Sequence, residues 1–319
     1  MSGSLPPKST LQASADRGHL LTEQPNPRSR ALDTLAVADL VDLFISEDLK
    51  PQQAVAAAAE SIAQAVEEIV ARLATGGRLF YVGAGTSGRL GVLDAAECPP
   101  TFCSPPELVQ GVLAGGSAAL LRSSEGLEDL REAGAEDLQT RGLREGDCVI
   151  GIAAGGTTPY VHGALDYALS IGALAIAMAC VPAAQAAMPC TIDIRLLTGP
   201  ELLTGSTRLK AGTATKMALN VISTTVMVRL GKVYGNRMVD VAATNSKLLD
   251  RSLRILRDLA DVPRDQGMEL LRQSEGSVKV ALLMAAARLD AEQARQLLQE
   301  HHQQLRSALV SCGAALKTA

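Results

Sequence analysis

The sequence predicts an α/β protein built on a doubly wound parallel sheet, followed by a small all-helical domain. Two observations favour this fold class. Five short apolar segments alternate with stretches of helical periodicity, as in β-α-β units whose sheet is covered on both faces. After them, the stretch 250–312 has helical periodicity only. The 319 residues are 47% apolar and contain few aromatic side chains, so Leu, Val, Ile and Ala must fill the core.

The segments before the sheet are expected to be a tail and two helices. Residues 1–30 are polar and contain Pro, which predicts a flexible tail. Apolar residues then recur at helical spacing over 35–44. A second helix is expected from Pro51, which suits a first helical turn, to Gly76, which ends it. These helices lead into an α/β domain predicted over 31–244.

The sheet and its covering helices are predicted from the alternation that follows. Strands are expected at 78–82, 108–113, 147–153, 173–180 and 191–197. Helices are expected between them at 87–96, 117–133 and 158–171. Ligands of such sheets bind in loops that leave the carboxyl ends of the strands, and these loops are rich in Gly, Ser or Thr here.

The last part of the chain is predicted to contain helices only. A long helix is expected from Leu209 to Gly231, and Asn245 can cap the next one. A small helical domain is predicted over 245–319. Its helices should stop at three positions, namely Pro263, Gly276 and Asp290.

Composition excludes several classes of function. With 30 basic and 34 acidic side chains, three Phe, four Tyr and no Trp, the chain lacks the charge and the aromatic residues of a nucleic-acid-binding protein. No apolar segment is long enough to cross a membrane or to form a signal-peptide core, so we expect a cytoplasmic protein. The six Cys and four His form no zinc-binding spacing, and no protein-bound metal is expected.

The first glycine-rich loop, 83–88, has the pattern G-x-G-x-x-G between a strand and a helix. A dinucleotide site also needs an acidic residue at the end of the next strand, and 111–116 contains none. The backbone N–H groups and the hydroxyls of Thr86 and Ser87 at a helix N-terminus suit one phosphate group. The alternative is a glycine turn that serves packing alone.

Two further loops supply hydroxyls and cations. Thr157 and the neighbouring threonine precede a proline at a predicted helix start. Ser206, Thr207 and Lys216 belong to the loop and first turns of the long helix. Cations there oppose the helix dipole unless an anion is bound. Alternatively, Lys210 and Lys216 are simply solvated, because six residues place them on different sides of a helix.

Two carboxylates are candidates for acid-base chemistry. Glu97 precedes two prolines that should end its helix at or just before Cys98. A carboxyl group in a last helical turn is easier to keep protonated, as a general acid requires. Glu128 lies in an acidic early turn, where such residues usually complement the dipole, and local sequence does not distinguish it from Glu125. A surface glutamate is the plainer interpretation of Glu97.

Several motifs taken together resemble the N-acetylmuramic acid 6-phosphate etherase family. They are the first glycine loop, Glu97 to Thr101, the loop at 114–116, the acidic turn around Glu128, the stretch 199–216, and 236–245. The resemblance covers nearly the whole chain. The stretch 199–216 is also similar to the signature of glucokinase regulatory proteins, which have two such sugar-isomerase (SIS) domains and lack the Glu-Cys-Pro-Pro element.

The resemblance implies an enzyme that uses no metal and no cofactor. It would cleave the lactyl ether of N-acetylmuramic acid 6-phosphate to N-acetylglucosamine 6-phosphate and D-lactate in cell-wall recycling. By motif position, Glu128 matches the base at C2 and Glu97 the acid that protonates the departing lactate. We place Thr86, Ser87, Thr157, Ser206, Thr207 and Lys216 around the sugar phosphate. Proteins of this kind usually form homodimers.

One residue departs from the family pattern, because Gly155 stands where the family usually has a serine. Thr157 can replace the missing hydroxyl, or affinity falls, or the preferred substrate differs. Two other functions therefore stay open. One is a phosphosugar sensor without turnover, and the other is an aldose–ketose isomerase, which also needs a base at C2 but no acid for an ether oxygen at C3.

Overall fold

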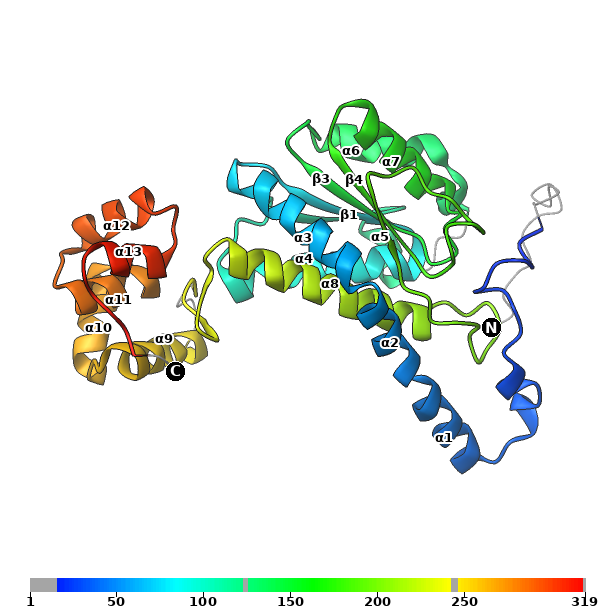
Figure 1. The fold of residues 1–319 in the computed structure, drawn as a ribbon, viewed down its shortest axis with the longest axis horizontal. Coiled ribbons are helices and arrows are strands. Elements are labelled where there is room, and N and C mark those ends of the chain that lie inside the picture. The colour runs from blue at the N-terminus through cyan, green and yellow to red at the C-terminus, as the bar shows by residue number, and fades with distance from the viewer. Residues whose placement is uncertain (1–15, 123–125, 242–245, 318–319) are drawn as a thin grey trace.

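The computed structural model describes residues 16–122, 126–241 and 246–317, and a five-stranded sheet forms the centre of the larger part (Figure 1). The strands are β1 (Leu79–Gly83), β2 (Val109–Leu113), β3 (Cys148–Ile152), β4 (Leu174–Ala179) and β5 (Ile192–Arg195). Their order is β2-β1-β3-β4-β5, and every neighbouring pair is parallel. The predicted fold class is confirmed, and each strand begins one residue after its expected start, although β5 ends two residues earlier than expected.

The strands are apolar on both sides because helices cover both faces of the sheet. Leu79 and Tyr81 point into a core shared with α3 (Ala59–Ala74), α4 (Gly85–Phe102) and α8 (Lys210–Arg229). Phe80 and Val82 point into a second core shared with α6 (Arg131–Thr140) and α7 (Pro159–Ser170). We call these the α8 face and the α7 face of the sheet.

The helices before the sheet form an arm. In Figure 1, α1 (Val37–Glu47) and α2 (Leu49–Ala57) extend away from the sheet, with α1 at the tip. The single helix expected from Pro51 to Gly76 is divided at Ala58, whose ψ of 10° lies outside the helical range and separates α2 from α3.

Residues 16–30 pack against the body, although their polar composition predicted a flexible tail. Leu20 is buried in the core of the α7 face, and the N–H of Leu21 donates a 2.9 Å hydrogen bond to Gln185 Oε1. Asn26 caps a short 3-10 helix (Pro27–Ser29), and a second one spans Leu32–Thr34. Residues 1–15 of the predicted tail lie outside the described residues.

The predicted end of the helix before the second strand was wrong. The helix that carries Glu97 continues through Pro99 and Pro100 to Phe102, where Cys103 adopts a left-handed conformation and its N–H bonds Pro99 O. Burial of Phe102 in the core of the α8 face offsets the loss of the backbone hydrogen bonds that Pro99 and Pro100 cannot donate.

The helix expected over 117–133 is replaced by shorter pieces. They are α5 (Ala118–Leu121), the 3-10 helix η4 (Leu127–Asp129) and the start of α6, which sequence analysis missed. Gly126 has φ +93° and Leu130 is extended, so a continuous helix is broken at both positions. Glu125, the alternative to Glu128, lies outside the described residues.

The C-terminal helices have a core of their own. They are α9 (Ser246–Ala260), α10 (Arg264–Gln273), α11 (Val278–Ala287), α12 (Ala291–Glu300) and α13 (Leu305–Ser311). The stops expected at Pro263, Gly276 and Asp290 fall between consecutive helices, as predicted. A hairpin of β6 (Val233–Tyr234) and β7 (Arg237–Met238), which was not predicted, precedes them. Asn245 and the predicted domain boundary lie outside the described residues.

Within the described ranges, none of the helices has the length and apolar character needed to cross a membrane.

Candidate functional site

Three loops rich in hydroxyls follow the carboxyl ends of β1, β3 and β5. The chain leaves β1 toward β2 and leaves β3 toward β4, so the strand order reverses between β1 and β3. At such a point the two loops diverge to opposite faces and leave a crevice in which α/β proteins bind ligands. Here α4 begins after Ala84 on the α8 face and α7 begins after Thr158 on the α7 face.

The hydroxyl side chains predicted to bind a phosphate lie in these loops. These side chains belong to Thr86, Ser87, Thr157, Ser206 and Thr207. Each of them is half-buried, and none of their hydroxyls has a hydrogen-bond partner within the described part of the chain. The methyl group of Thr86 lies 3.6 Å from the point that a Cβ at Gly212 would occupy, so the first loop packs beside the start of α8. The structure therefore brings Thr86 and the 205–209 loop together.

The loop after β3 is completed by the N-terminal segment. The hydroxyls of Thr22 and Thr157 lie 3.7 Å and 3.8 Å from the position of a Cβ on Gly155. The Thr22 hydroxyl is buried, and no hydrogen-bond partner for it lies among the described residues. Sequence analysis missed Thr22, because nothing in a polar N-terminal segment indicates that it returns to a strand end more than 130 residues later.

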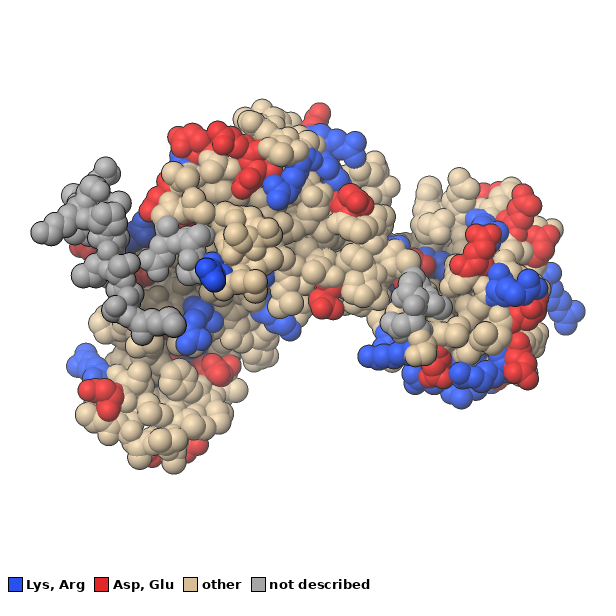
Figure 2. All heavy atoms as spheres, turned by 180° about the vertical axis from the view of Figure 1, so that it is seen from behind, with Lys and Arg blue, Asp and Glu red and all other residues tan. Residues whose placement is uncertain are grey.

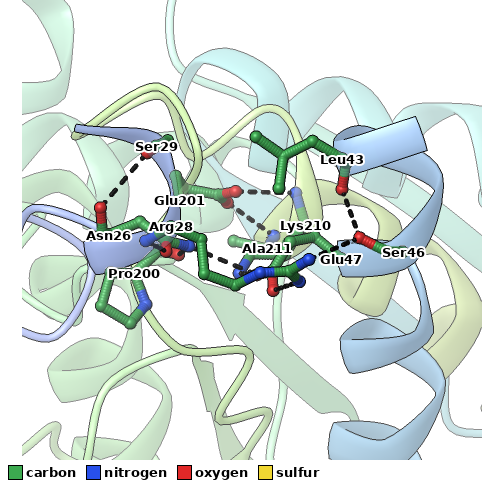
Figure 3. Close-up of polar contacts among 10 residues, drawn as sticks. All are labelled: Asn26, Arg28, Ser29, Leu43, Ser46, Glu47, Pro200, Glu201, Lys210 and Ala211. Carbon is green, nitrogen blue, oxygen red and sulfur yellow. Dashed lines mark hydrogen bonds and ion pairs between the residues drawn. The ribbon is translucent and has the colours of Figure 1, made fainter. Parts of the chain in front are cut away.

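The basic start of α8 is balanced by carboxylates of the same chain. Lys210, expected to be solvated or to bind an anion, is buried, and its Nζ lies 2.5 Å from Glu47 Oε2 at the end of α1 (Figure 3). Glu201 accepts the N–H groups of Lys210 and Ala211 at 3.1 Å and 2.9 Å, and so caps the helix. The conflict between these cations and the helix dipole is thus resolved internally.

The two carboxyl groups in this cluster have opposite pKa shifts. Burial raises the pKa of Glu47, but hydrogen bonds from Lys210 and Arg28 outweigh it, and the pKa is lowered overall. Burial raises the pKa of Glu201 more than the two backbone N–H groups lower it. Asn26 also bonds Glu47 Oε2, at 3.3 Å, which ties the N-terminal segment to this cluster (Figure 3). The arrangement holds α1, α8 and the loop after β5 together.

Glu97 lies in a separate cavity between α4 and α8. This cavity of about 260 Å³ is also lined by Lys216 and Asp94. Asp94 is buried and accepts hydrogen bonds from Asn220 and Ser223 of α8, whereas the side chains of Glu97 and Lys216 are exposed. The last-turn argument for Glu97 was wrong, because α4 continues for five residues beyond it. A carboxylate and an ammonium group nevertheless share one exposed cavity.

Glu128 is exposed on η4, on the other side of the sheet from Glu97. Leu127 beside it packs on the core of the α7 face, whereas α4 packs through Ala95 and Cys98 on the α8 face. Glu97 is also twelve residues beyond Gly85, which places it about 18 Å along α4 from the hydroxyl loops. One chain alone therefore does not bring Glu97 and Glu128 together.

Metal ligands are not grouped in the described ranges. No three His, Cys, Asp or Glu side chains in them are placed to hold a metal ion.

Comparison with known proteins identifies the family. The chain is 75% identical over 307 residues to an N-acetylmuramic acid 6-phosphate etherase from Synechococcus sp. (strain CC9902), covering 96% of this chain and 97% of that protein. The chain belongs to the N-acetylmuramic acid 6-phosphate etherase family.

Other relatives agree with this placement. Proteins of the same name from Parasynechococcus marenigrum (strain WH8102) and Prochlorococcus marinus (strain MIT 9303) are both 72% identical. They cover 97% and 95% of this chain, and 98% and 96% of their own lengths, respectively. Residues 61–169 match the family described as the glucokinase regulatory protein N-terminal SIS domain. The SIS fold expected from the sequence is thus confirmed.

Proposed function

We propose that this protein is an N-acetylmuramic acid 6-phosphate etherase, a carbon–oxygen lyase that releases D-lactate from the sugar phosphate. The observation that carries the proposal is the 75% identity to an etherase across 96% of the chain. We expect the reaction to take place in the cytoplasm as part of cell-wall recycling. All six cysteines are free thiols, as is usual in a reducing compartment.

The chemistry proceeds by elimination and then hydration. In the open-chain sugar the aldehyde makes the C2 hydrogen acidic, and Glu128 removes it as a proton. The C3–O bond breaks as Glu97 delivers a proton to the departing lactate oxygen. Water then adds at C3 of the unsaturated aldehyde and a proton returns to C2, which gives N-acetylglucosamine 6-phosphate. Each proton transfer by a positioned side chain contributes about 10²–10⁴-fold to the rate.

Phosphate binding falls to the hydroxyl loops. Thr86 and Ser87 lie at the N-terminus of α4, where backbone N–H groups and the helix dipole favour an anion. Ser206, Thr207 and Thr157 offer further hydroxyls, which have no hydrogen-bond partner in the described ranges. The phosphate is remote from C2 and C3, so its binding energy positions the reacting carbons.

The two carboxylates belong to one site only if two chains build it. A base and an acid that act on adjacent carbons must both come within hydrogen-bond reach of one sugar. On one chain Glu97 and Glu128 occupy opposite sides of the sheet. We therefore assign a homodimer in which Glu97 and Lys216 of one protomer serve a substrate held by the hydroxyl loops and Glu128 of its partner.

The decisive experiment follows oxygen and hydrogen during turnover. Purified protein is incubated with N-acetylmuramic acid 6-phosphate in water enriched in ¹⁸O and deuterium, and the products are analysed by mass. Elimination and hydration place ¹⁸O on the amino sugar and deuterium at its C2, while the released lactate keeps its original oxygen.

Other outcomes contradict the proposal in distinct ways. Label in the lactate means direct attack on the lactyl carbon. A sugar phosphate product that keeps its lactyl ether, with no lactate released, means isomerisation. Ligand-induced thermal stabilisation without product means a phosphosugar sensor, a function suggested by the match to a glucokinase regulatory domain and by the absent serine at Gly155.

We expect Gly155→Ser to lower KM about 2- to 10-fold and to leave kcat unchanged. Gly155 does not have a positive φ, and a Cβ there makes only ordinary contacts, so the hydroxyl can be added without strain. The added hydroxyl would lie in the loop that we propose to bind the substrate, and one hydrogen bond from it to the substrate would contribute about 0.5–1.5 kcal/mol. Steady-state kinetics measure the change.

Gly156→Ser is the matched control for this experiment. Gly156 has φ +70°, and a Cβ there would lie 2.9 Å from the Ala186 side chain, so this variant should lose thermal stability. A KM for Gly155→Ser that equals or exceeds that of the unmodified protein would show that Thr157 already supplies the missing contact.

A further inference from the structure

The arm formed by α1 and α2 carries an apolar stripe that covers nothing in the described part of its own chain. Val37, Val41, Ile45 and Leu49 lie four residues apart, on one side of the arm, and their exposed fractions are 77%, 51%, 63% and 63%. The opposite side of α1 faces the body through Phe44, which lines a cavity beside α8, and through the buried Glu47. The outward stripe is therefore not required to hold α1 in place.

An apolar groove lies where the arm joins the body of the molecule. Its volume is about 870 Å³, and it runs between α2, α3 and α8, with walls formed by Val55, Ile62, Val66, Val70 and Val221. Alanines at 56, 59, 63 and 71 line it as well, which leaves room for a helix to approach closely. Two charged side chains, Glu67 and Arg229, also line it.

The stripe and the groove match in length and chemistry. From Val37 to Leu49 the stripe spans about 18 Å, and the α3 side of the groove, from Ala59 to Ala71, also spans about 18 Å. Asp39, Asp42 and Lys50 flank the stripe and have no ion pair among the described residues. They offer charges of both signs to Arg229 and Glu67. Figure 2 shows the arm with few charged side chains, in contrast to the densely charged C-terminal helices.

The groove cannot receive α1 of its own chain. α1 leads directly into α2, which forms one wall of the groove, and Glu47 at the end of α1 is held by Lys210 and Arg28. The stripe continues through Leu49 to Ala56, which lies seven residues further along α2, on the same side of the helix, and lines the groove, so a single surface carries both the protruding and the receiving part. A surface of this kind is self-complementary about a two-fold axis.

We propose that α1 of one protomer lies in the groove between α2, α3 and α8 of its partner, and that the exchange is reciprocal. The inference rests on the two-chain site of the proposed function and names the surface that builds it. The groove touches one side of α8 at Val221 and Arg229, and the cavity of Glu97 touches the other side at Lys216. A partner seated in the groove therefore lies across α8 from the cavity of Glu97.

The test is the oligomeric state of three single variants of the full chain, measured by sedimentation velocity at micromolar concentration without substrate. Val41→Asp places a carboxylate in the stripe, and Ala63→Asp places one in the groove. Val310→Asp is the matched control, because Val310 is 74% exposed on α13, far from both. Circular dichroism verifies that each variant is folded. Val41 and Ala63 are exposed in the single chain, so a carboxylate at either position is not expected to unfold it.

We expect a dimer for the unmodified protein and for Val310→Asp. Val41→Asp and Ala63→Asp should each raise the dimer dissociation constant at least about 100-fold, because two-fold symmetry repeats the unpaired carboxylate at two places. A monomeric unmodified protein, or a dimer that persists in either interface variant, overturns this inference. Lactate release is assayed separately, so that a dimer formed through another surface leaves the proposed activity intact.

Discussion

Glu128→Gln and Glu97→Gln are each expected to lower kcat about 10²–10⁴-fold while leaving the affinity for the sugar phosphate nearly unchanged. Each substitution removes one proton transfer and preserves the shape of the side chain. Both residues are exposed, so the fold should not be affected. Lactate release measures turnover, and thermal shift with the product N-acetylglucosamine 6-phosphate measures binding. Asp129→Asn, next to Glu128 on the same 3-10 helix, is the matched control and should retain full activity.

Mixing the two inactive variants tests whether the carboxylates come from different chains. If they do, a mixed dimer has one site with both glutamates and one site with neither. Random exchange of equal amounts then restores about one quarter of the unmodified activity. If a single chain supplies both carboxylates, mixing restores nothing. Such a result would contradict the two-chain site without contradicting the catalytic roles of Glu97 and Glu128.

Lys210→Met is expected to reduce the free energy of unfolding by about 3–5 kcal/mol. Breaking a buried ion pair leaves an uncompensated charge, here the carboxylate of Glu47, and this costs more than the pair itself contributes. Denaturant unfolding measures the change. Lys216→Met, on the same helix but exposed, is the control and should alter stability by no more than about 0.5 kcal/mol.

The pH dependence separates charge from packing in this experiment. The pKa of Glu47 is lowered in the folded protein from its ordinary value of 4.5, so the ionised form stabilises the fold above that pH and the effect is lost as the pH falls. The stability difference between the unmodified protein and Lys210→Met should therefore narrow below about pH 4.5. A constant difference down to acid pH would mean that Lys210 acts through packing of its aliphatic chain.

Strand positions could be predicted from sequence because each strand is a short apolar segment between breaks in helical periodicity. A strand buried on both faces needs no partner information to be recognised. Helix ends depended instead on tertiary contacts. Pro99 and Pro100 are strong local stop signals, but the burial of Phe102 outweighs them. The C-terminal stops at Pro263, Gly276 and Asp290 were predicted correctly, since there local capping and helix breaking coincide with the packing.

The site was only partly accessible to the same reasoning. The hydroxyl loops follow strand ends, so their meeting at one edge of the sheet follows from the fold class alone. The partner of Lys210 could not be predicted in this way, because Glu47 lies 163 residues away in the sequence and no local pattern indicates the contact. Whether Glu97 and Glu128 share a face depends on strand order and on the path of the chain after β2, which periodicity does not reveal.

The anchoring of Leu21 to Gln185, 164 residues further along the chain, has a consequence for biosynthesis. The segment around Leu20 leaves the ribosome before any strand, whereas its docking place is formed by parts of the chain made much later. The segment cannot dock on the body until β3, α7 and the turn at Gln185 have been translated. Thr22, which borders the loop after β3, therefore reaches its position only after more than half of the chain has been made, although it is among the first residues to be synthesised.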